Sequence, residues 1–245
     1  MEYSIDMCST YTCYKLGSKD VYVFDEHNMA LPVWGTHSAQ KMAALSLVTF
    51  DTHADTRNPF ARFMGRAGCT TNRKYMDNLL IKEHLKDYHY LRTDFSFEDV
   101  WRLSVCDVAH DEQIQTAVDW GYLASYTVVC GLSKECAKDY QQQDEWDGLP
   151  AKYISRCDWF SVAAEIIDQH DHAKLVMDYD LDFFRCADDM NEEFIDSIKP
   201  LISQSQVITI ARERACFDSV SLDSSFTNDD ALKSLLRIIK NDCGA

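Results

Sequence analysis

The sequence predicts an α/β protein in which a mostly parallel sheet is covered by helices on both faces, a three-layer α/β/α arrangement. Apolar segments of strand length alternate along the chain with segments of helical periodicity. The strand cores are nearly continuous runs of Val, Ile and Leu, typical of parallel strands that are buried on both faces. Polar residues gather where these strands end, and sites in open α/β sheets lie at the carboxyl ends of strands.

The order of the expected elements follows from these patterns. Strands are predicted over Asp20–His27, Leu45–Phe50, Ser125–Leu132, Ala173–Phe184 and Ser205–Arg214. Helices are predicted over Met29–Ala44, Tyr75–Tyr88, His110–Leu123, Trp159–His170, Glu192–Ser203 and Asn228–Asp242. The first helix is expected to be interrupted near Pro32 and Gly35, and the last to be capped by Asn228 or Asp229.

Composition excludes several classes of protein. The chain has 245 residues without a Ser-, Gly- or Pro-rich linker, which predicts a single domain over residues 1–245. The net charge of −16 repels nucleic acid and would attract a basic peptide, or it serves solubility alone. Residues 1–10 do not resemble a signal peptide, and no apolar run approaches the length of a membrane span. We therefore expect a cytoplasmic protein with reduced cysteines and no membrane partner; the oligomeric state is left open.

Three of the predicted strands end in residues that bind metal ions. In chain order these are His27; Asp51, His53 and Asp55; and Asp178, Asp180 and Asp182. Alternate residues of an extended strand share a face, so each set could converge on one place. Several carboxylates cannot lie together uncompensated, so either some are protonated or cations hold them. The alternative is that both Asp clusters are helix caps and surface charge.

The types of these residues indicate the metal. A mixed nitrogen and oxygen set without thiolate favours Mn²⁺, Fe²⁺ or Zn²⁺. The number of carboxylates suits two ions bridged by an Asp and separated by roughly 3.5–4 Å. The sequence contains no phosphate-binding glycine motif, so nucleotide binding has no support.

These motifs resemble those of the ureohydrolases, which include arginase and agmatinase and share their fold with the deacetylases. The segment FDTHADT is similar to the D-A-H-x-D motif of that family, MDYDLDFF to its S-x-D-x-D motif, and VFDEHN lies where the family has G-G-D-H. His37 also lies before Asp51, but in the intervening helix, so His27 is the preferred ligand. The sequence from Val21 to Arg214 resembles still more closely a divergent branch of the family that includes the peptide arginases. Those enzymes convert arginine to ornithine within ribosomally made peptides.

The resemblance implies a ligand set for two Mn²⁺ ions. It comprises His27, Asp51, His53, Asp55, Asp180 and Asp182, with the register Asp178/Asp180 as the alternative for the last pair. It also implies the chemistry, in which the two ions activate a water that attacks the guanidinium carbon and urea leaves. The expected partner is then an arginine-containing precursor peptide, and Mn²⁺ rather than Fe²⁺ depends on the resemblance alone.

Three further residues are candidates for catalysis. Glu213 follows the strand where ureohydrolases have their guanidinium-binding Glu, since a planar guanidinium pairs best with a bidentate acceptor; the alternative is a surface pair with Arg212 or Arg214. The family's histidine proton shuttle has no counterpart here. His110 is a candidate substitute, or the solvent-facing start of a helix, and either Asp55 or Asp111 could relay the proton to the leaving amine.

Other functions remain open at this point. A ureohydrolase that acts on a free small guanidine would share the metal site. An amide hydrolase of the deacetylase type would use one Zn²⁺, usually beside a tandem His pair that this sequence lacks. A metal-stabilised binding module without turnover would explain the missing shuttle histidine.

Overall fold

The fold was described from a computed structural model of the chain. The structure describes residues 3–4, 11–57, 96–106, 108–131, 134, 137–139 and 151–243. The predicted helix Tyr75–Tyr88 lies outside these residues. Contacts divide the chain into two compact units, each built from separated segments. The sheet unit comprises Met1–His27, Leu45–Ala54 and Ser125–Ala245, and the helical unit comprises Asn28–Ala44 and Asp55–Ala124.

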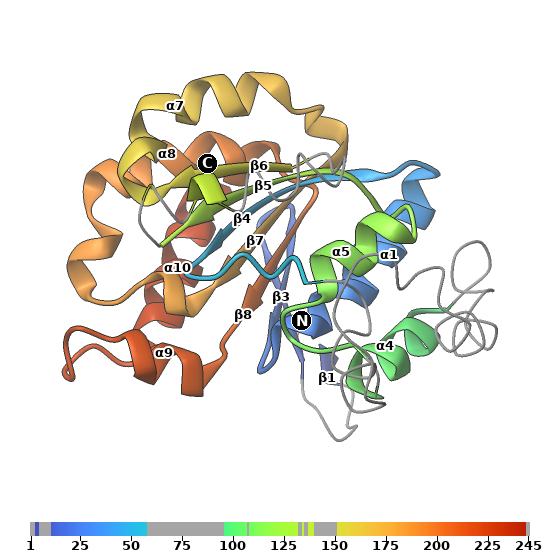
Figure 1. The fold of residues 1–245 in the computed structure, drawn as a ribbon, viewed down its shortest axis with the longest axis horizontal. Coiled ribbons are helices and arrows are strands. Elements are labelled where there is room, and N and C mark those ends of the chain that lie inside the picture. Colours follow the sequence, from blue (N-terminus) through green and yellow to red (C-terminus); the bar gives the residue numbers. More distant parts are fainter. Residues whose placement is uncertain are drawn as a thin grey trace. The chain divides into compact units, whose positions relative to one another are not determined.

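The sheet has eight strands in the order β1-β2-β3-β8-β7-β4-β5-β6 (Figure 1). Their bounds are β1 Tyr3–Ser4, β2 Thr12–Leu16, β3 Lys19–Phe24, β4 Leu45–Asp51, β5 Leu123–Cys130, β6 Ala151–Ser155, β7 Leu175–Asp180 and β8 Val207–Ala211. The pairs β3–β8, β8–β7, β7–β4 and β5–β6 are parallel, whereas β1–β2 and β2–β3 are antiparallel. The prediction of an α/β fold with a mostly parallel sheet flanked by helices is confirmed.

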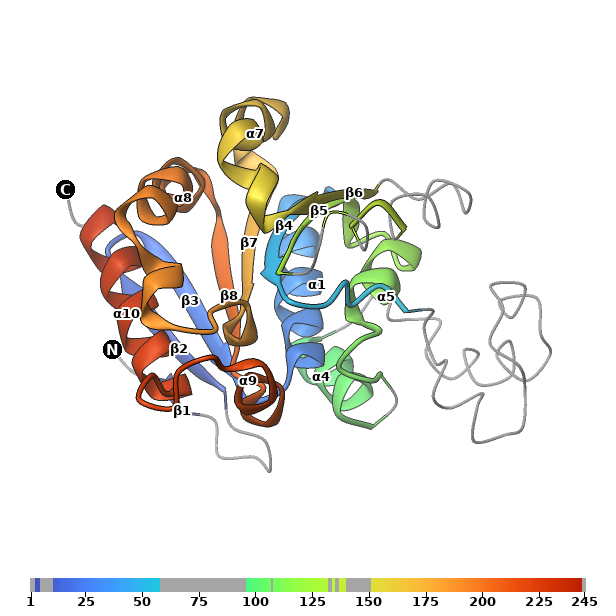
Figure 2. The same cartoon turned by 60° about the vertical axis from the view of Figure 1, so that its left-hand side comes forward.

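Within the sheet unit, one face of the sheet carries helices with a shared apolar core. The helices are α7 Arg156–Gln169, α8 Glu192–Gln204, α9 Arg214–Val220 and α10 Asn228–Cys243. Figures 1 and 2 both show α8 and α10 alongside the sheet, and contacts join α8 to β7 and α10 to β2. Phe50, Met177 and Ile208 of the strands pack in one cluster with Trp159 of α7 and Ile198 of α8, all of them almost fully buried. This burial is the main stabilisation that holds the strand ends in place.

The helical unit contains α1 Ala30–Lys41, α4 Phe97–Cys106 and α5 Gln113–Asp119, and α1 packs on both of the others. The expected interruption of the first helix is wrong. Pro32 stands in the first turn of α1, where an amide has no intrahelical partner to lose. The helix also continues through Gly35. Packing accounts for the glycine there, because a Cβ would lie 2.9 Å from the ring of Tyr122.

Several predicted bounds also differ from the structure. The sequence patterns did not predict β2, β6, α4 and α9, of which β2, β6 and α9 have only five to seven residues. The helix expected from His110 begins at Gln113. Thr227, rather than Asn228 or Asp229, caps α10, since its hydroxyl accepts from the Asp230 N–H at 3.2 Å while Asp230 Oδ2 accepts from the Thr227 N–H at 3.1 Å. Among the described residues no helix is long and apolar enough to cross a membrane. The following cysteines are not joined in disulfides: Cys13, Cys130, Cys157, Cys186, Cys216 and Cys243.

Candidate metal centre

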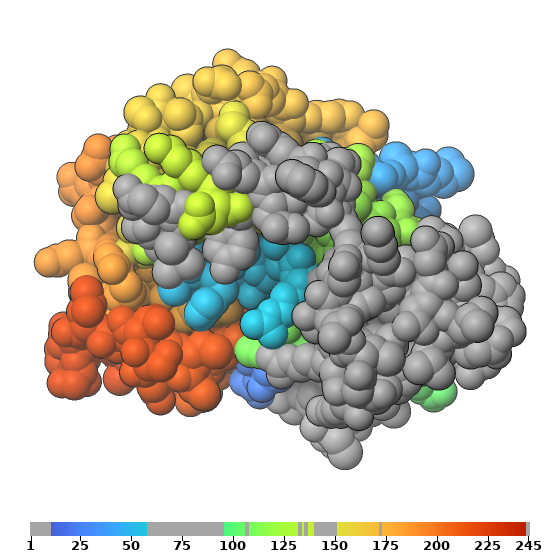
Figure 3. All heavy atoms as spheres, in the orientation of Figure 1, coloured from blue at the N-terminus to red at the C-terminus, as the bar shows by residue number. Residues whose placement is uncertain are grey.

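The carboxyl ends of four adjacent parallel strands bring the predicted ligands together. Because β3, β8, β7 and β4 run in the same direction, their ends share one edge of the sheet. His27 follows β3, Glu213 follows β8, Asp180 ends β7 and Asp51 ends β4. In Figure 3 the segment that follows β4, coloured cyan, reaches the molecular surface. His53 in this segment is 51% exposed, whereas His27, Asp51 and Asp180 are buried.

Asp178 orients the imidazole of His27. Both side chains are fully buried, and His27 Nε2 lies 2.7 Å from Asp178 Oδ2. Thr49 and Thr209, the cross-strand neighbours of Asp178, donate their hydroxyls to its two oxygens at 2.8 and 2.5 Å. With Nε2–H donating to this carboxylate, the lone pair of His27 is on Nδ1, the tautomer that a metal ligand requires. Asp178 thus has its oxygens engaged by other protein groups.

The first ligand group consists of His27, Asp51 and Asp180. Their ligand atoms lie within 4.8 Å of one another and are all buried. Nδ1 of His27 is 3.4 Å from Asp51 Oδ2 and 3.6 Å from Asp180 Oδ2. Two atoms that bind one ion at about 2.1 Å lie roughly 3.0–3.4 Å apart, so this spacing is close to that of ligands around a common cation.

A second ligand group shares Asp51 with the first. It consists of Asp51, His53 and Asp182, again within 4.8 Å. Nδ1 of His53 lies 3.1 Å from Asp182 Oδ2 and 3.8 Å from Asp51 Oδ1. Asp51 therefore presents Oδ2 to one group and Oδ1 to the other. A carboxylate shared in this way has the form of a bridging ligand between two ions.

Local turns produce the alternate spacing of these ligands. The Asp51 carboxylate accepts from the His53 N–H at 2.6 Å, and the Asp180 carboxylate accepts from the Asp182 N–H at 3.1 Å. β4 consequently ends at Asp51 and β7 at Asp180, and the residue two positions later lies in a turn. The expectation that the strand continues to Phe184 is wrong, because a 3₁₀ turn, η5, spans Leu181–Phe183. The ligands converge through these turns rather than along one strand face.

The buried carboxylates of the ligand groups would be stabilised by a cation. Burial raises the pKa of Asp180 well above its usual value, and the nearby Asp182 and Asp51 carboxylates raise it further. A cation would replace this repulsion by attraction. The buried cluster around His27, Asp51 and Asp180 could hold a metal ion, since its nitrogen and oxygen donors fit Mn²⁺, Fe²⁺ or Zn²⁺.

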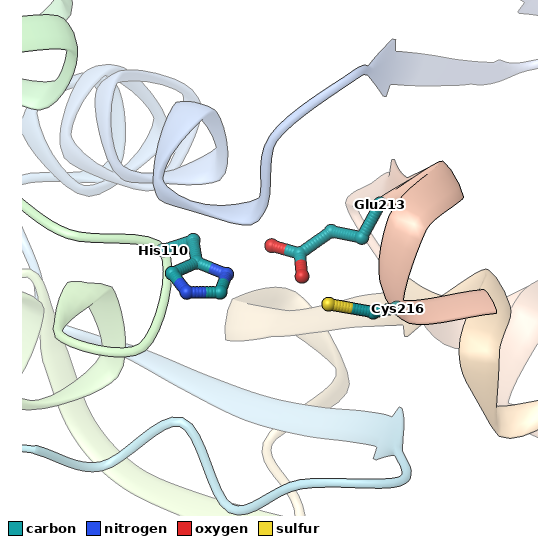
Figure 4. A group of neighbouring side chains, drawn as sticks. All are labelled: His110, Glu213 and Cys216. Carbon is teal, nitrogen blue, oxygen red and sulfur yellow. The ribbon is translucent and has the colours of Figure 1, made fainter. Parts of the chain in front are cut away.

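Glu213 lies beside the first ligand group, and its own backbone is strained. Its φ of 33° is in the left-handed region, and its carboxylate accepts from the His27 N–H at 3.1 Å. Figure 4 shows the Cys216 side chain next to Glu213 at the start of α9. Burial, followed by the hydrogen bond and charge of Glu213, raises the pKa of the Cys216 thiol. The neutral thiol is thus a donor to the carboxylate.

The alternative, a surface pair of Glu213 with Arg212 or Arg214, is not formed. Arg212 and Arg214 both form ion pairs with Asp229, and Arg212 also donates to Asn228. Glu213 itself is only 7% exposed. A buried carboxylate at the carboxyl edge of the sheet can bind a cationic group of a substrate.

Three of the candidate site residues belong to the helical unit. Asp55, the first residue of its segment, accepts from Gln113 Nε2 at 2.9 Å and has a φ of 51°. Asp111 forms an ion pair with Arg57 at 3.0 Å. His110, labelled in Figure 4, is half-buried in the turn before α5, which differs from the expected solvent-facing helix start.

The sequence patterns did not predict that Asp178 orients His27, or that Thr49 and Thr209 donate hydrogen bonds to Asp178. The signal for Asp178 was present, because the sequence has three alternate Asp residues where two suffice for the ligand pair. The threonines lie inside apolar strands, and only the strand register makes them neighbours of Asp178. Cys216 had no local signal at all.

Comparison with known proteins gives no assignment. No protein-family model matches the chain, and no curated protein matches it. The reasons for assigning a function are therefore the residues of the site and their arrangement.

Proposed function

We propose that the protein is a metal-dependent hydrolase that converts arginine residues of a ribosomally made peptide to ornithine and releases urea. The observation that carries this proposal is the pair of ligand groups that share Asp51. A second observation is the buried Glu213 carboxylate, which adjoins His27 of the first group. Two divalent ions with an acidic residue beside them suit a cationic, hydrolysable substrate such as a guanidinium group.

The proposed ligands of the two ions are divided between the groups. His27, Asp51 and Asp180 hold one ion, and Asp51, His53 and Asp182 hold the other. Asp55, which follows His53 by two residues in the D-x-H-x-D motif, is the further proposed ligand. When bound, two Mn²⁺ ions would lower the pKa of a water and stabilise negative charge that develops during hydrolysis.

The remaining roles belong to side chains of the chain itself. Glu213 would accept hydrogen bonds from the planar guanidinium, and the His27 N–H would hold that carboxylate in orientation. His110 would serve as the proton shuttle, or Asp55 or Asp111 would relay the proton to the leaving amine. Water adds across the bond that breaks, so the arginine side chain leaves as the ornithine amine and its carbon leaves in urea.

The test is the mass of an arginine-containing peptide before and after incubation with the protein and Mn²⁺. The proposal expects a loss of CH₂N₂ for each modified arginine, together with one urea. Turnover of free arginine or agmatine without any change in the peptide would show that the substrate is a small guanidine and not a peptide. No turnover of any guanidine, with metal bound, would overturn the proposal in favour of an amide hydrolase or a binding module.

Glu213→Gln tests the guanidinium partner separately from the metal. The amide loses the negative charge but keeps the size of the side chain, so we expect two bound ions and a fall in kcat/KM of at least a hundredfold. Glu193→Gln on α8 removes the same charge from an exposed position and serves as the control. Metal content by mass spectrometry and urea release are measured on both variants; an active Glu213→Gln protein would place the guanidinium elsewhere.

A further inference from the structure

Two arginines at the carboxyl edge of the sheet share a single carboxylate oxygen. Arg156 begins α7 directly after β6, and its Nη1 lies 2.7 Å from Asp189 Oδ2. Arg185 donates its backbone N–H to the same oxygen at 2.7 Å, and its Nε lies 3.5 Å from it. Two guanidinium groups and one carboxylate leave a net charge of +1, in a chain whose net charge is −16.

The guanidinium of Arg156 is held in place but not satisfied. It lies 3.9 Å from the centre of the Phe183 ring, and its side chain is 16% exposed. Within the described part of the chain, Nε, Nη1 and Nη2 of Arg156 and Nε of Arg185 are buried without a hydrogen-bond partner. Nη1 of Arg156 forms an ion pair with Asp189.

Such an arrangement is costly unless a further acceptor is present. A buried charged donor without an acceptor is unfavourable because it has lost its hydration. A guanidinium is a planar fork that matches a carboxylate with two parallel hydrogen bonds. The Arg185 side chain is 35% exposed, so an anion can approach this residue from solvent.

Arg156 also contacts a residue that is adjacent in sequence to the second ligand group. Phe183, on which Arg156 stacks, directly follows the ligand Asp182 in η5. Asp182 is anchored from the β4 side, since its Oδ1 and its carbonyl oxygen accept from the Thr52 N–H and hydroxyl at 3.2 and 2.9 Å. Arg156 therefore contacts the residue next to Asp182, and Arg185 follows Asp182 by three residues.

We propose that Arg156 and Arg185 form a carboxylate-binding subsite that holds an acidic group of the substrate beside the target arginine. This inference rests on the proposed function and narrows its substrate class. The carboxylate has two possible sources: the acidic side chain of a neighbouring peptide residue, or the α-carboxylate of the arginine itself.

The test is a pair of fluorescently labelled peptides that differ only in a Glu or a Gln next to the arginine. Binding to the Mn²⁺-loaded protein is measured by fluorescence anisotropy, with free arginine and argininamide as competitors. We expect the Glu peptide, or free arginine in the competition arm, to bind about tenfold more tightly than its amide partner. Arg185→Gln should reduce that ratio to threefold or less, and Arg156→Lys, which keeps the charge but loses the planar fork, should lower it too. Arg237→Gln, exposed on α10, removes the same charge and should leave the ratio unchanged.

Each outcome decides one question. Equal affinities within both pairs, or the same ratio in Arg185→Gln and Arg237→Gln, would overturn the subsite. A preference that only Arg185→Gln and Arg156→Lys reduce would establish it, and the pair that discriminates would identify the source. Urea release is measured in parallel: binding preference without any urea would overturn the proposed function and leave the subsite standing.

Discussion

At the scale of single residues, one carboxylate decides how the site is assembled. Asp178, Asp180 and Asp182 are equivalent in the sequence pattern, but only Asp180 and Asp182 join the ligand groups. Asp178 is engaged by His27 and two threonines, so it would act on a bound metal through the imidazole. The arrangement favours the Asp180/Asp182 register over Asp178/Asp180.

Asp178→Asn should weaken metal binding without unfolding the protein. The amide can donate to Nε2, which shifts the imidazole proton toward Nδ1, the atom that faces Asp51 and Asp180. We expect a 10- to 100-fold loss of Mn²⁺ affinity, as for other residues that support a metal ligand. Titration calorimetry measures it, with the exposed Asp188→Asn as the matched control. Equal affinities of the two variants would contradict the assigned role.

His53 and His27 should contribute unequally to the two metal positions. The His53 side chain is 51% exposed, whereas His27 is fully buried. His53→Ala should therefore lower the bound metal from two ions to one while the melting temperature of the metal-free protein stays close to that of the wild type. His170→Ala at the end of α7 is the control, and metal content after gel filtration is the measurement. Two ions retained by His53→Ala would exclude His53 as a ligand.

At the scale of elements, strand ends and helix contacts follow different rules. Turns capped by the Asp51 and Asp180 carboxylates end β4 and β7, so the strands stop where the ligands begin. In α1, by contrast, Gly35 is required by packing and does not end the helix, because Tyr122 occupies the space of a side chain.

Gly35→Ala should destabilise the helical unit although alanine is the better helix former. Alanine would gain about 1 kcal/mol of intrinsic helix propensity, but its Cβ would meet ring atoms of the buried Tyr122 at 2.9–3.2 Å. Overpacking of this kind costs about 1–3 kcal/mol, so we expect a net loss in the free energy of unfolding. Urea denaturation measures it against Gln40→Ala, an exposed site on the same helix. A more stable Gly35→Ala protein would show that Tyr122 moves aside freely.

At the scale of the whole molecule, acidic charge links stability to pH and metal. Burial and the Asp182 and Asp51 carboxylates raise the pKa of Asp180 in the folded chain above the value of about 3.9 expected when unfolded. The folded state thus binds the proton more tightly. The contribution of this group to stability is full below the unfolded pKa and is lost as pH rises through the folded pKa.

Metal addition should therefore raise the melting temperature more at pH 7.5 than at pH 5.5. At the higher pH the metal-free protein carries the unfavourable charge, and a cation compensates it; at the lower pH a proton must first leave. Scanning calorimetry with Mn²⁺ or with chelator, at both pH values, measures the difference. Asp180→Asn should give a smaller difference, and the same increment at both pH values in the wild type would contradict the role of Asp180.

The sequence by itself determined the fold class and the stretches that bear the ligands. Buried parallel strands require continuous apolar runs, and the polar residues after Phe50 and Met177 stand out against them in the one-dimensional pattern. Short elements such as β6 and α9 escaped because a few residues carry too little periodicity to be recognised. Asn228 and Asp229 were reasonable caps, but Thr227 caps α10.

The tertiary structure alone decided which side chains face one another. Strand register places Thr49 and Thr209 on either side of Asp178, although they are far apart in the chain. The order of the strands brings His27 to Asp178 across β8, and it brings the Glu213 carboxylate to the His27 N–H. Arg156 and Arg185 share Asp189 for the same reason. Such contacts depend on distances between strands and helices, which long-range packing sets and local residue patterns do not encode.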